Sequence, residues 1–185
     1  MKLIHLCILL GCLSQGSFAI FSWGTCPAPL VETSFNFDKF MGLWYEAARP
    51  KSVYAQEGKC DQFQFTRKQD NVFEMGIIEV RDGEWHSIHG NGYCDKGEAT
   101  CHVSFSNYWP KSQYQILETD YDKYAVMYTC SSMGLFHWHY AWVLEREIDS
   151  VDPDILIQKL EARTGIPRDM MMHTDHTDCP KIWAF

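Results

Sequence analysis

Cysteines and histidines are the residues of this chain best suited to chemistry, and the chain has eight of each. A thiolate metal site usually needs closely spaced cysteines, and no C-x-x-C pair occurs, which argues against structural zinc. Cys7 and Cys12 lie in an N-terminal segment that we expect to be removed. The others form an even set with fifteen possible disulfide pairings, as is typical of an exported protein. They are Cys26, Cys60, Cys94, Cys101, Cys130 and Cys179.

The same residues argue against an enzyme. Cys94 and Cys101 are close in sequence and are expected to bridge one hairpin, so that full pairing leaves no free thiol. No Ser-His-Asp arrangement or carboxylate pair is apparent, although nucleophilic or acid–base catalysis needs such groups. We therefore predict that the protein is not an enzyme. The alternative is an enzyme that acts on a lipophilic substrate.

Residues 1–19 have the three regions of a secretory signal peptide. Lys2 supplies a positive charge, Leu6–Leu13 is an apolar run, and Ser17-Phe18-Ala19 supplies small residues for cleavage. The run is too short to cross a bilayer, which disfavours a membrane anchor, and a buried helix is the other alternative. We predict a secreted, extracellular protein with no transmembrane segment and one domain over residues 20–185.

The charge of the chain narrows the range of partners. Its formal net charge is −8 at pH 7. An acidic protein is repelled by phosphate groups, so nucleic acid and anionic membranes are not expected as partners. The sequence leaves open whether the protein forms a homo-oligomer.

The order of apolar runs predicts an all-β fold. Short runs of aromatic and β-branched residues recur between Gly, Asp, Asn or Pro residues, and several alternate strictly with polar residues, which places each apolar set on one face. Asp82-Gly83 is a strong hairpin signal between two such runs. We predict strands near residues 43–50, 60–67, 72–81, 84–94, 101–107, 113–119, 123–130 and 137–146.

One amphipathic helix is expected after the strands. Asp152 suits the N-cap, Pro153 the first helical position, and Gly165 the end of the helix. Eight antiparallel strands followed by a helix suit a closed up-and-down barrel with that helix packed outside, and such a barrel can enclose one small ligand. The apolar stripe that would face the barrel comprises Leu156, Ile157 and Leu160.

Three segments resemble the motifs of the lipocalin family. Gly42-Leu43-Trp44-Tyr45-Glu46 resembles its G-x-W motif, and Thr119-Asp120-Tyr121 with Tyr124-Ala125 resembles its T-D-Y-x-x-Y-A motif. Arg146, at the end of the last predicted strand, resembles the third motif. A single G-x-W is a weak signal, but all three in this order are specific. The match to the segments around Trp44 and Tyr121 is closest to the branch of apolipoprotein D, bilin-binding proteins and crustacyanins.

This resemblance implies a fold, disulfides and a function. The fold is an eight-stranded lipocalin barrel, and the branch implies the pairs Cys26–Cys130 and Cys60–Cys179, with Cys94–Cys101 as an additional bridge. The function would be that of a carrier for a small hydrophobic ligand such as a lipid, sterol or retinoid. No cofactor is required, and the alternative is a pigment-binding lipocalin that holds a bilin or a carotenoid.

The motif residues are expected to be structural. Trp44 should plug the closed end of the barrel, and the resemblance places Arg146 across its indole ring. Gly42, Thr119, Asp120 and Tyr121 complete the motifs. Asp120 and Tyr121 suit a turn at the closed end, and the alternative for this end is contact with a receptor.

The inward faces of the strands form the predicted ligand site. Their side chains are apolar and rich in rings, which suits a large flat or polyene ligand. A filled core would need the same pattern, so alternation alone does not distinguish the two. The expected lining residues are Phe63, Phe65, Phe73, Met75, Ile77, Ile88, Val103, Phe105, Tyr114, Ile116, Met127, Trp138, Tyr140 and Trp142.

Charged and histidine side chains contribute little to this predicted site. Apart from Arg81 near the mouth, no lysine or arginine is expected on an inward face. A fatty-acid carboxylate buried in the lumen would therefore lack an obvious partner. Most histidines are expected to be solvated on the surface, and His137 and His139 should point away from Trp138. His86 is the best lumen candidate for a haem or metal ligand, but we predict no metal site.

Overall fold

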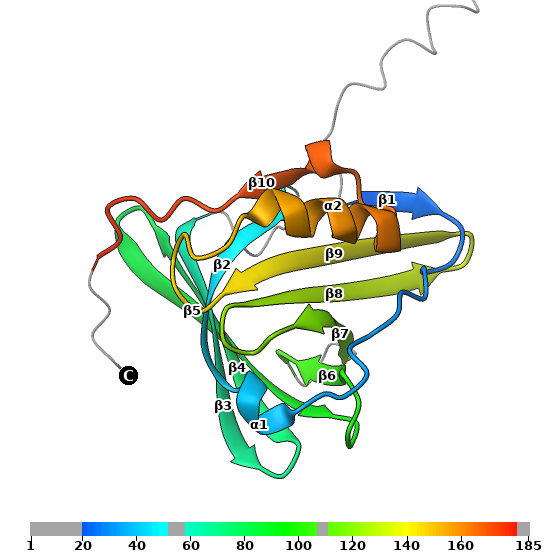
Figure 1. The fold of residues 1–185 in the computed structure, drawn as a ribbon, viewed down its shortest axis with the longest axis horizontal. Coiled ribbons are helices and arrows are strands. Elements are labelled where there is room, and N and C mark those ends of the chain that lie inside the picture. Colours follow the sequence, from blue (N-terminus) through cyan, green and yellow to red (C-terminus); the bar gives the residue numbers. More distant parts are fainter. Residues whose placement is uncertain (1–19, 52–57, 107–110, 181–185) are drawn as a thin grey trace, which may run out of the picture.

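The computed structural model describes residues 20–51, 58–106 and 111–180. Most of these residues form one antiparallel sheet that closes into a barrel (Figure 1). The predicted eight strands are all present, and their ends agree within a few residues, although one strand ends at Ser104 rather than at residue 107. They are β2 (Gly42–Pro50), β3 (Lys59–Gln69), β4 (Val72–Arg81), β5 (Glu84–Cys94), β6 (Thr100–Ser104), β7 (Ser112–Thr119), β8 (Tyr124–Met133) and β9 (Phe136–Glu145).

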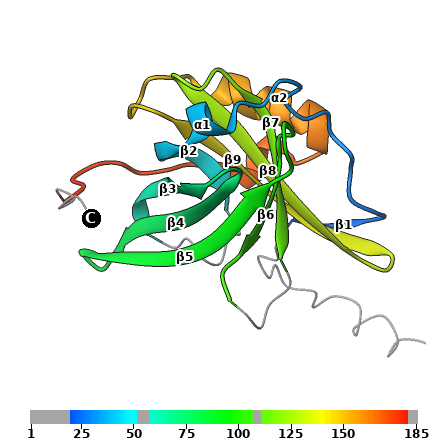
Figure 2. The ribbon, with the colours of Figure 1, turned by 90° about the horizontal axis from the view of Figure 1, so that it is seen from below.

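Each strand pairs with its neighbour in sequence, as in an up-and-down barrel. Pairing of β2 with β9 closes the sheet, with Tyr45 opposite Glu145. Figure 2 shows strands β2–β5 curving along one side of the barrel and β6–β9 forming the other. The predicted lipocalin fold, a closed eight-stranded barrel with a helix outside, is confirmed.

The turn between β4 and β5 shows how local sequence sets the register. Asp82 and Gly83 both have positive φ, at 55° and 81°, as a two-residue hairpin of this kind requires. Arg81 and Glu84 are therefore paired directly across the turn. The pairing continues without a break to Val72 and Tyr93, so one turn aligns the whole β4–β5 ribbon.

The predicted helix is α2 (Pro153–Thr164), and its ends have the expected chemistry. The Asp152 side chain accepts a hydrogen bond from the Asp154 N–H, and Gly165 adopts the left-handed conformation at φ 76°. Leu156, Ile157 and Leu160 are buried in a second apolar core, outside the barrel. The helix lies across the outside of the sheet above β9 (Figure 1).

Four short elements were not predicted. They are β1 (Ile20–Trp23), α1 (Phe37–Phe40), the 3₁₀ helix η1 (Arg168–Met170) and β10 (Met171–His173). β1 pairs with β9, and β10 pairs with the end of β2, so both extend the sheet beyond the closed barrel. Short edge strands of this kind depend on the partner strand and carry little signal of their own in sequence.

Candidate ligand-binding lumen

The inner face of the barrel carries most of the predicted lining residues. Ten of the fourteen lie in one buried apolar cluster, and Phe105 and Tyr140 are partly buried against it. Trp138 is half-buried on β9, two residues beyond Tyr140. The ten are Phe63, Phe65, Phe73, Met75, Ile77, Val103, Tyr114, Ile116, Met127 and Trp142.

Ile88 is the exception among the predicted lining residues. It lies opposite Ile77 in the register of β4 and β5, which places it on the inner face. Its side chain is nevertheless 43% exposed, whereas Ile77 is buried. Ile88 therefore lies on the predicted face but in its accessible part, toward the open end of the barrel.

The closed end of the lumen is packed. Phe65 lies against Phe40 and Phe73, with ring centroids 5.1 and 5.7 Å apart. Gly92 of β5 leaves room for the Phe73 ring, since a Cβ atom there would lie 2.6 Å from it. Farther along β5, Gly90 leaves room for Phe105 in the same way, at 2.9 Å. The cavity left here is about 10 Å³, which is room for one water molecule at most.

Trp142 is the centre of the lumen. Its ring is 6.0 Å from Phe63 and 5.8 Å from Tyr114, and it continues to Tyr140 at 6.3 Å. The rings of Phe63 on β3 and Tyr114 on β7 therefore lie against Trp142 from other strands of the barrel. Burial raises the pKa of Tyr114, so its hydroxyl stays neutral. The inner face here consists of aromatic ring surfaces with neutral polar tips.

Accessibility increases toward one end of the barrel. Along the inner face of β9, Leu144 and Trp142 are buried, whereas Tyr140 and Trp138 are half-buried. Ile88 and Phe105 become more accessible toward the same end of β5 and β6. This end of the barrel is therefore the more accessible one, and the end at Leu144 is closed.

Trp44 and Arg146 close the barrel at its lower end. The Trp44 ring is fully buried, and its Nε1 donates to the Phe40 carbonyl at 2.8 Å. The Arg146 guanidinium carbon is 3.6 Å from the centre of that ring. The guanidinium also donates to the main-chain carbonyls of Leu43, Tyr121, Lys39, Phe40 and Met41. Arg146 therefore joins three segments of chain in addition to covering the indole.

The turn after β7 is held by its own side chains. The Asp120 carboxylate accepts the N–H groups of Lys123 and Tyr124, and the Thr119 hydroxyl accepts the Tyr121 N–H. Tyr121 has a positive φ of 68°, which these bonds stabilise. The geometry supports the turn-forming role expected for these residues, and the Tyr121 carbonyl is one of the groups bound by Arg146.

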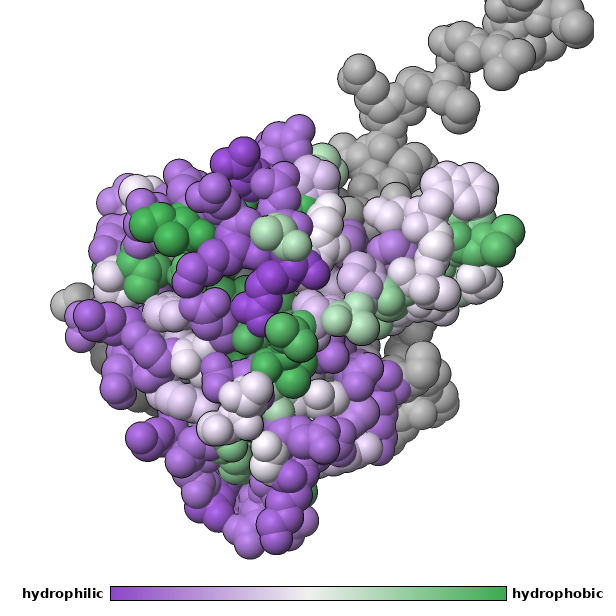
Figure 3. Space-filling view, turned by 45° about the vertical axis from the view of Figure 1, so that its right-hand side comes forward, coloured by the Kyte–Doolittle hydropathy of each residue, from purple (hydrophilic) through white to green (hydrophobic). Residues whose placement is uncertain are grey.

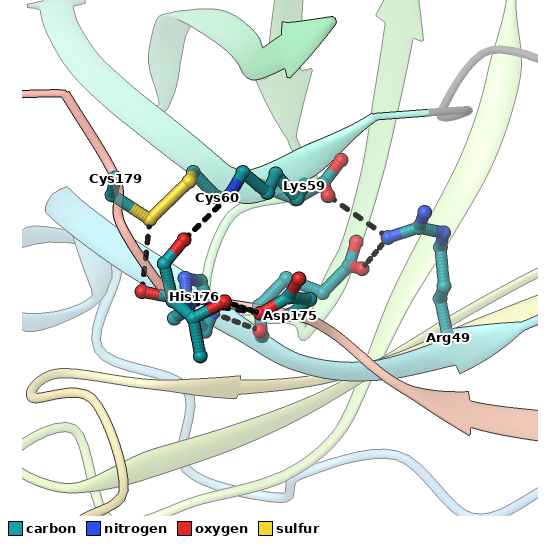
Figure 4. The surroundings of a disulfide bond; sticks show 9 residues. Arg49, Lys59, Cys60, Asp175, His176 and Cys179 are labelled. Carbon is teal, nitrogen blue, oxygen red and sulfur yellow. Dashed lines mark hydrogen bonds and ion pairs between the residues drawn. A yellow bond between two sulfur atoms is a disulfide. The ribbon is translucent and has the colours of Figure 1, made fainter. Parts of the chain in front are cut away.

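A buried charged cluster beside β2 and β3 was missed by the sequence analysis. Arg49 donates to Glu46 at 2.6 Å and to Asp61 at 2.9 Å, and all three side chains are buried (Figure 4). On β4, Arg81 forms an ion pair with the buried Glu79. The alternation that places Phe63 and Ile77 inward continues to Asp61 and Glu79, and this pattern was the available signal.

The C-terminal segment covers this cluster from outside. The Thr174 hydroxyl donates to Glu46, and the Cys60 N–H donates to the Asp175 carbonyl. The disulfide between Cys60 and Cys179 holds the segment against β3 (Figure 4). This disulfide thus fixes the wall of the barrel at the point where β2 and β3 separate.

Titration of the cluster predicts how stability depends on pH. Burial raises the pKa of Asp61 to about 7, Glu46 adds to the effect, and Arg49 opposes it. The folded state then holds a proton that the unfolded chain releases near pH 4, so this contribution to stability is lost as the pH rises through 7. Burial lowers the pKa of His139 to about 4, which acts in the opposite direction, with stability lost as the pH falls.

We therefore expect Asp61→Asn to change how the unfolding free energy varies with pH, and not only to shift it by a constant amount. The difference in unfolding free energy between wild type and variant should fall by about 1 kcal/mol per pH unit between pH 5 and 7. Urea unfolding at four pH values measures it. Asp70→Asn, on an exposed side chain, is the control and should run parallel to wild type. A constant difference for Asp61→Asn would show that Asp61 is ionised throughout.

All six expected disulfide cysteines are paired in the structure. The bonds are Cys26–Cys130, Cys60–Cys179 and Cys94–Cys101. The third bond links facing residues of β5 and β6, and both of its cysteines lie in the inner apolar cluster. It therefore forms part of the floor of the lumen as well as bridging a hairpin.

The histidines divide into exposed and buried groups. His86 and His89 on β5 are exposed, so His86 does not present a buried lumen ligand. His137 and His139 point away from Trp138, as expected, but they are 5% and 2% exposed. These two are therefore exceptions to the expectation that most histidines are solvated, because β1 lies alongside β9 at this position.

A second hollow lies outside the barrel. It is a groove of about 620 Å³ over the outer faces of β2–β5, and its lining includes Leu43, Tyr45, Gln62, Ile78 and His89. In the space-filling view most of the surface is hydrophilic, with separate apolar patches (Figure 3). The groove is a competing ligand site that experiments on the lumen must distinguish.

The sequence and the structure of this chain are similar to those of the same group of known proteins. Residues 41–178 match the family model described as the lipocalin / cytosolic fatty-acid binding protein family. The chain is 30% identical to apolipoprotein D of Cavia porcellus over 185 residues, which cover 97% of each chain. It is 25% identical to insecticyanin-A of Manduca sexta over 135 residues, which cover 69% of this chain and 71% of the relative.

Solved structures show the same fold. Insecticyanin of Manduca sexta superposes with a TM-score of 0.73 at 19% identity, covering 87% of this chain and 91% of its own. Apocrustacyanin C1 superposes with a TM-score of 0.72 at 20% identity, covering 86% and 93%. At these identities the likeness concerns the barrel and not the ligand.

Proposed function

The chain belongs to the lipocalin / cytosolic fatty-acid binding protein family, and we propose that it is a secreted carrier of a small hydrophobic molecule held in the barrel lumen. The observation that carries this proposal is the inner face itself. It is apolar and aromatic from the closed end to Trp142, and it becomes accessible at the opposite end. The rings above the packed closed end offer apolar surface to a ligand, and the accessible end supplies a route of entry.

The space that the ligand would occupy is the upper half of the lumen. The closed end is filled by Phe65 and Phe73, so a bound molecule would lie above them, against the row of Trp142, Tyr140 and Trp138 on β9. Rings at these positions offer flat surfaces for stacking, and aromatic pairs contribute beyond the area they bury. A larger ligand would require Trp142 to change its side-chain rotamer.

The charged groups favour a ligand without a carboxylate. Arg81 already forms an ion pair with Glu79, and Arg49 binds both Glu46 and Asp61. A ligand carboxylate placed near this cluster would meet three acidic groups for two arginines. We therefore propose a neutral ligand, or one with hydrogen-bond donors, such as a sterol or a retinoid alcohol, over a free fatty acid.

A pigment is the second candidate ligand. The row of rings from Phe63 through Trp142 to Tyr140 suits a conjugated molecule such as a bilin or a carotenoid. No step of chemistry is required of the protein in either case. We propose that it binds and does not catalyse, since the cysteines from Cys26 to Cys179 are all in disulfides and offer no thiol nucleophile.

Export and assembly remain proposals. The predicted signal peptide, residues 1–19, lies outside the described residues. Among the residues that the structure describes, no helix is long and apolar enough to cross a membrane. We propose that residues 20–185 form one secreted domain that binds its small lipophilic ligand as a monomer or as a homo-oligomer.

Fluorescence titration tests the proposed function. Trp138 and Trp142 lie on the inner face of β9, so a retinoid, a carotenoid or biliverdin in the lumen should quench their emission strongly. At least one lipophile from a panel of sterol, retinoid, fatty acid, carotenoid and biliverdin should bind with micromolar or tighter affinity, and the fatty acid should bind more weakly than the retinoid alcohol. Failure of every ligand to bind would contradict an open lumen.

A further inference from the structure

Two buried histidines lie side by side on the outer face of β9. His137 and His139 are two residues apart, so both point to the same side of the strand, opposite to Trp138. They are covered by β1, in which Ser22 lies opposite His137 and Ile20 opposite His139. Buried imidazoles usually have hydrogen-bond partners on both nitrogens, and this pair does not fully satisfy that rule.

In each histidine, Nδ1 has a hydrogen-bond partner and Nε2 points away from that partner. His137 Nδ1 is 3.1 Å from the Gly24 carbonyl, which can only accept, so Nδ1 carries the proton and Nε2 keeps its lone pair. His139 Nδ1 is 3.2 Å from the Tyr128 hydroxyl. Within the described part of the chain, His139 Nε2 is buried and has no hydrogen-bond partner.

The two rings are close enough to share one ion. Their centroids are 4.9 Å apart at 87°, and a nitrogen of each lies within 4.8 Å of the other and of Cys130 Sγ. Two nitrogens on a tetrahedral zinc ion are about 3.3 Å apart, a separation that small ring rotations would reach. The Cys130 sulfur is bonded to Cys26, so it is not a thiolate and we do not count it as a ligand.

From this arrangement we infer that His137 and His139 form a binding site for a late first-row divalent metal ion, Zn²⁺ or Cu²⁺, on the outside of the barrel. Imidazole nitrogens are ligands that both ions favour. The Gly24 carbonyl and the Tyr128 oxygen would accept the Nδ1 protons, as the outer partners of metal-bound histidines commonly do. Water or a small anion would complete the coordination.

The surroundings of the site agree with this role. His139 is 2% exposed, and its Nε2 has no hydrogen-bond partner among the described residues, so this nitrogen is available to a metal ion. The site is separated from the lumen by the β9 strand, because Trp138 and Tyr140 point to the other face. Metal and hydrophobic ligand would therefore bind independently.

Metal titration of the full secreted chain without a histidine tag tests the proposal. We expect one Zn²⁺ or Cu²⁺ per protein and a higher melting temperature with the ion bound. His137→Gln and His139→Gln should each weaken binding at least tenfold, while His89→Gln, on an exposed side chain, should leave it unchanged. Retained lumen ligand binding would show that the variants are folded.

A second measurement needs no variant. In the electron paramagnetic resonance spectrum of the wild-type Cu²⁺ complex, nitrogen hyperfine structure from two imidazoles is expected. The proposal is overturned if wild type binds neither ion stoichiometrically, if the spectrum shows no nitrogen ligands, or if both histidine variants bind as wild type does. Any of these results would leave the lumen function untouched.

Discussion

Replacing Arg146 by alanine is expected to lower the free energy of unfolding by about 3–5 kcal/mol. The side chain stacks on Trp44, with the guanidinium carbon 3.6 Å from the ring centre, and donates to main-chain carbonyls of two segments, residues 39–43 and Tyr121. Removing it exposes the indole and leaves several carbonyls at the closed end without their donor. Chemical denaturation followed by tryptophan emission measures the loss.

The same variant should keep most of its affinity for a lumen ligand when measured well below its melting temperature. Arg146 lies at the closed end, below the packed rings of Phe40 and Phe65. Arg168→Ala, which removes an exposed ion pair with Glu161, is the matched control and should change stability by less than about 0.5 kcal/mol. A large loss of affinity at an unchanged melting temperature would show that the ligand binds at the closed end.

Replacing Trp142 by alanine should weaken binding of a hydrophobic ligand by about 1–3 kcal/mol, or roughly 5- to 150-fold. Trp142 contacts Phe63, Tyr114 and Tyr140, so its removal deletes the largest ring surface of the central lumen. The dissociation constant from quenching of Trp138, confirmed by calorimetry, measures the effect.

Tyr45→Ala is the control for this experiment. Tyr45 lines the groove outside β2–β5, so its loss should spare a ligand in the lumen. If Tyr45→Ala weakens binding more than Trp142→Ala, the ligand occupies the outer groove and the proposed lumen site is wrong.

The strands could be predicted because their pattern depends only on residues that are close together in the sequence. Alternation placed Phe63, Phe73 and Trp142 on one face, and the Asp82-Gly83 turn aligned β4 with β5. The ends of α2 followed from Asp152 and Gly165 in the same way. These features depend on the periodicity of apolar residues and on the residue types at turns and helix ends, both of which can be seen in a short stretch of sequence.

Contacts between distant segments could not be predicted in this way. The exposure of Ile88 depends on where β5 leaves the cover of the other strands, and the burial of His137 and His139 depends on β1 lying beside β9. The carboxylates of Glu46 on β2 and Asp61 on β3 meet at Arg49, and Glu46 also binds Thr174 of the C-terminal segment.

By itself, the sequence determined the barrel, the outer helix and the motif residues Trp44 and Arg146, because periodicity and capping act over a few residues. The tertiary structure alone decided how much of the inner face is filled. Phe73 and Phe105 occupy the space that Gly92 and Gly90 leave on the neighbouring strand β5, and no pattern along one strand records the volume of side chains on another. The depth of the lumen and the pairing of His137 with His139 are for that reason properties of the folded molecule.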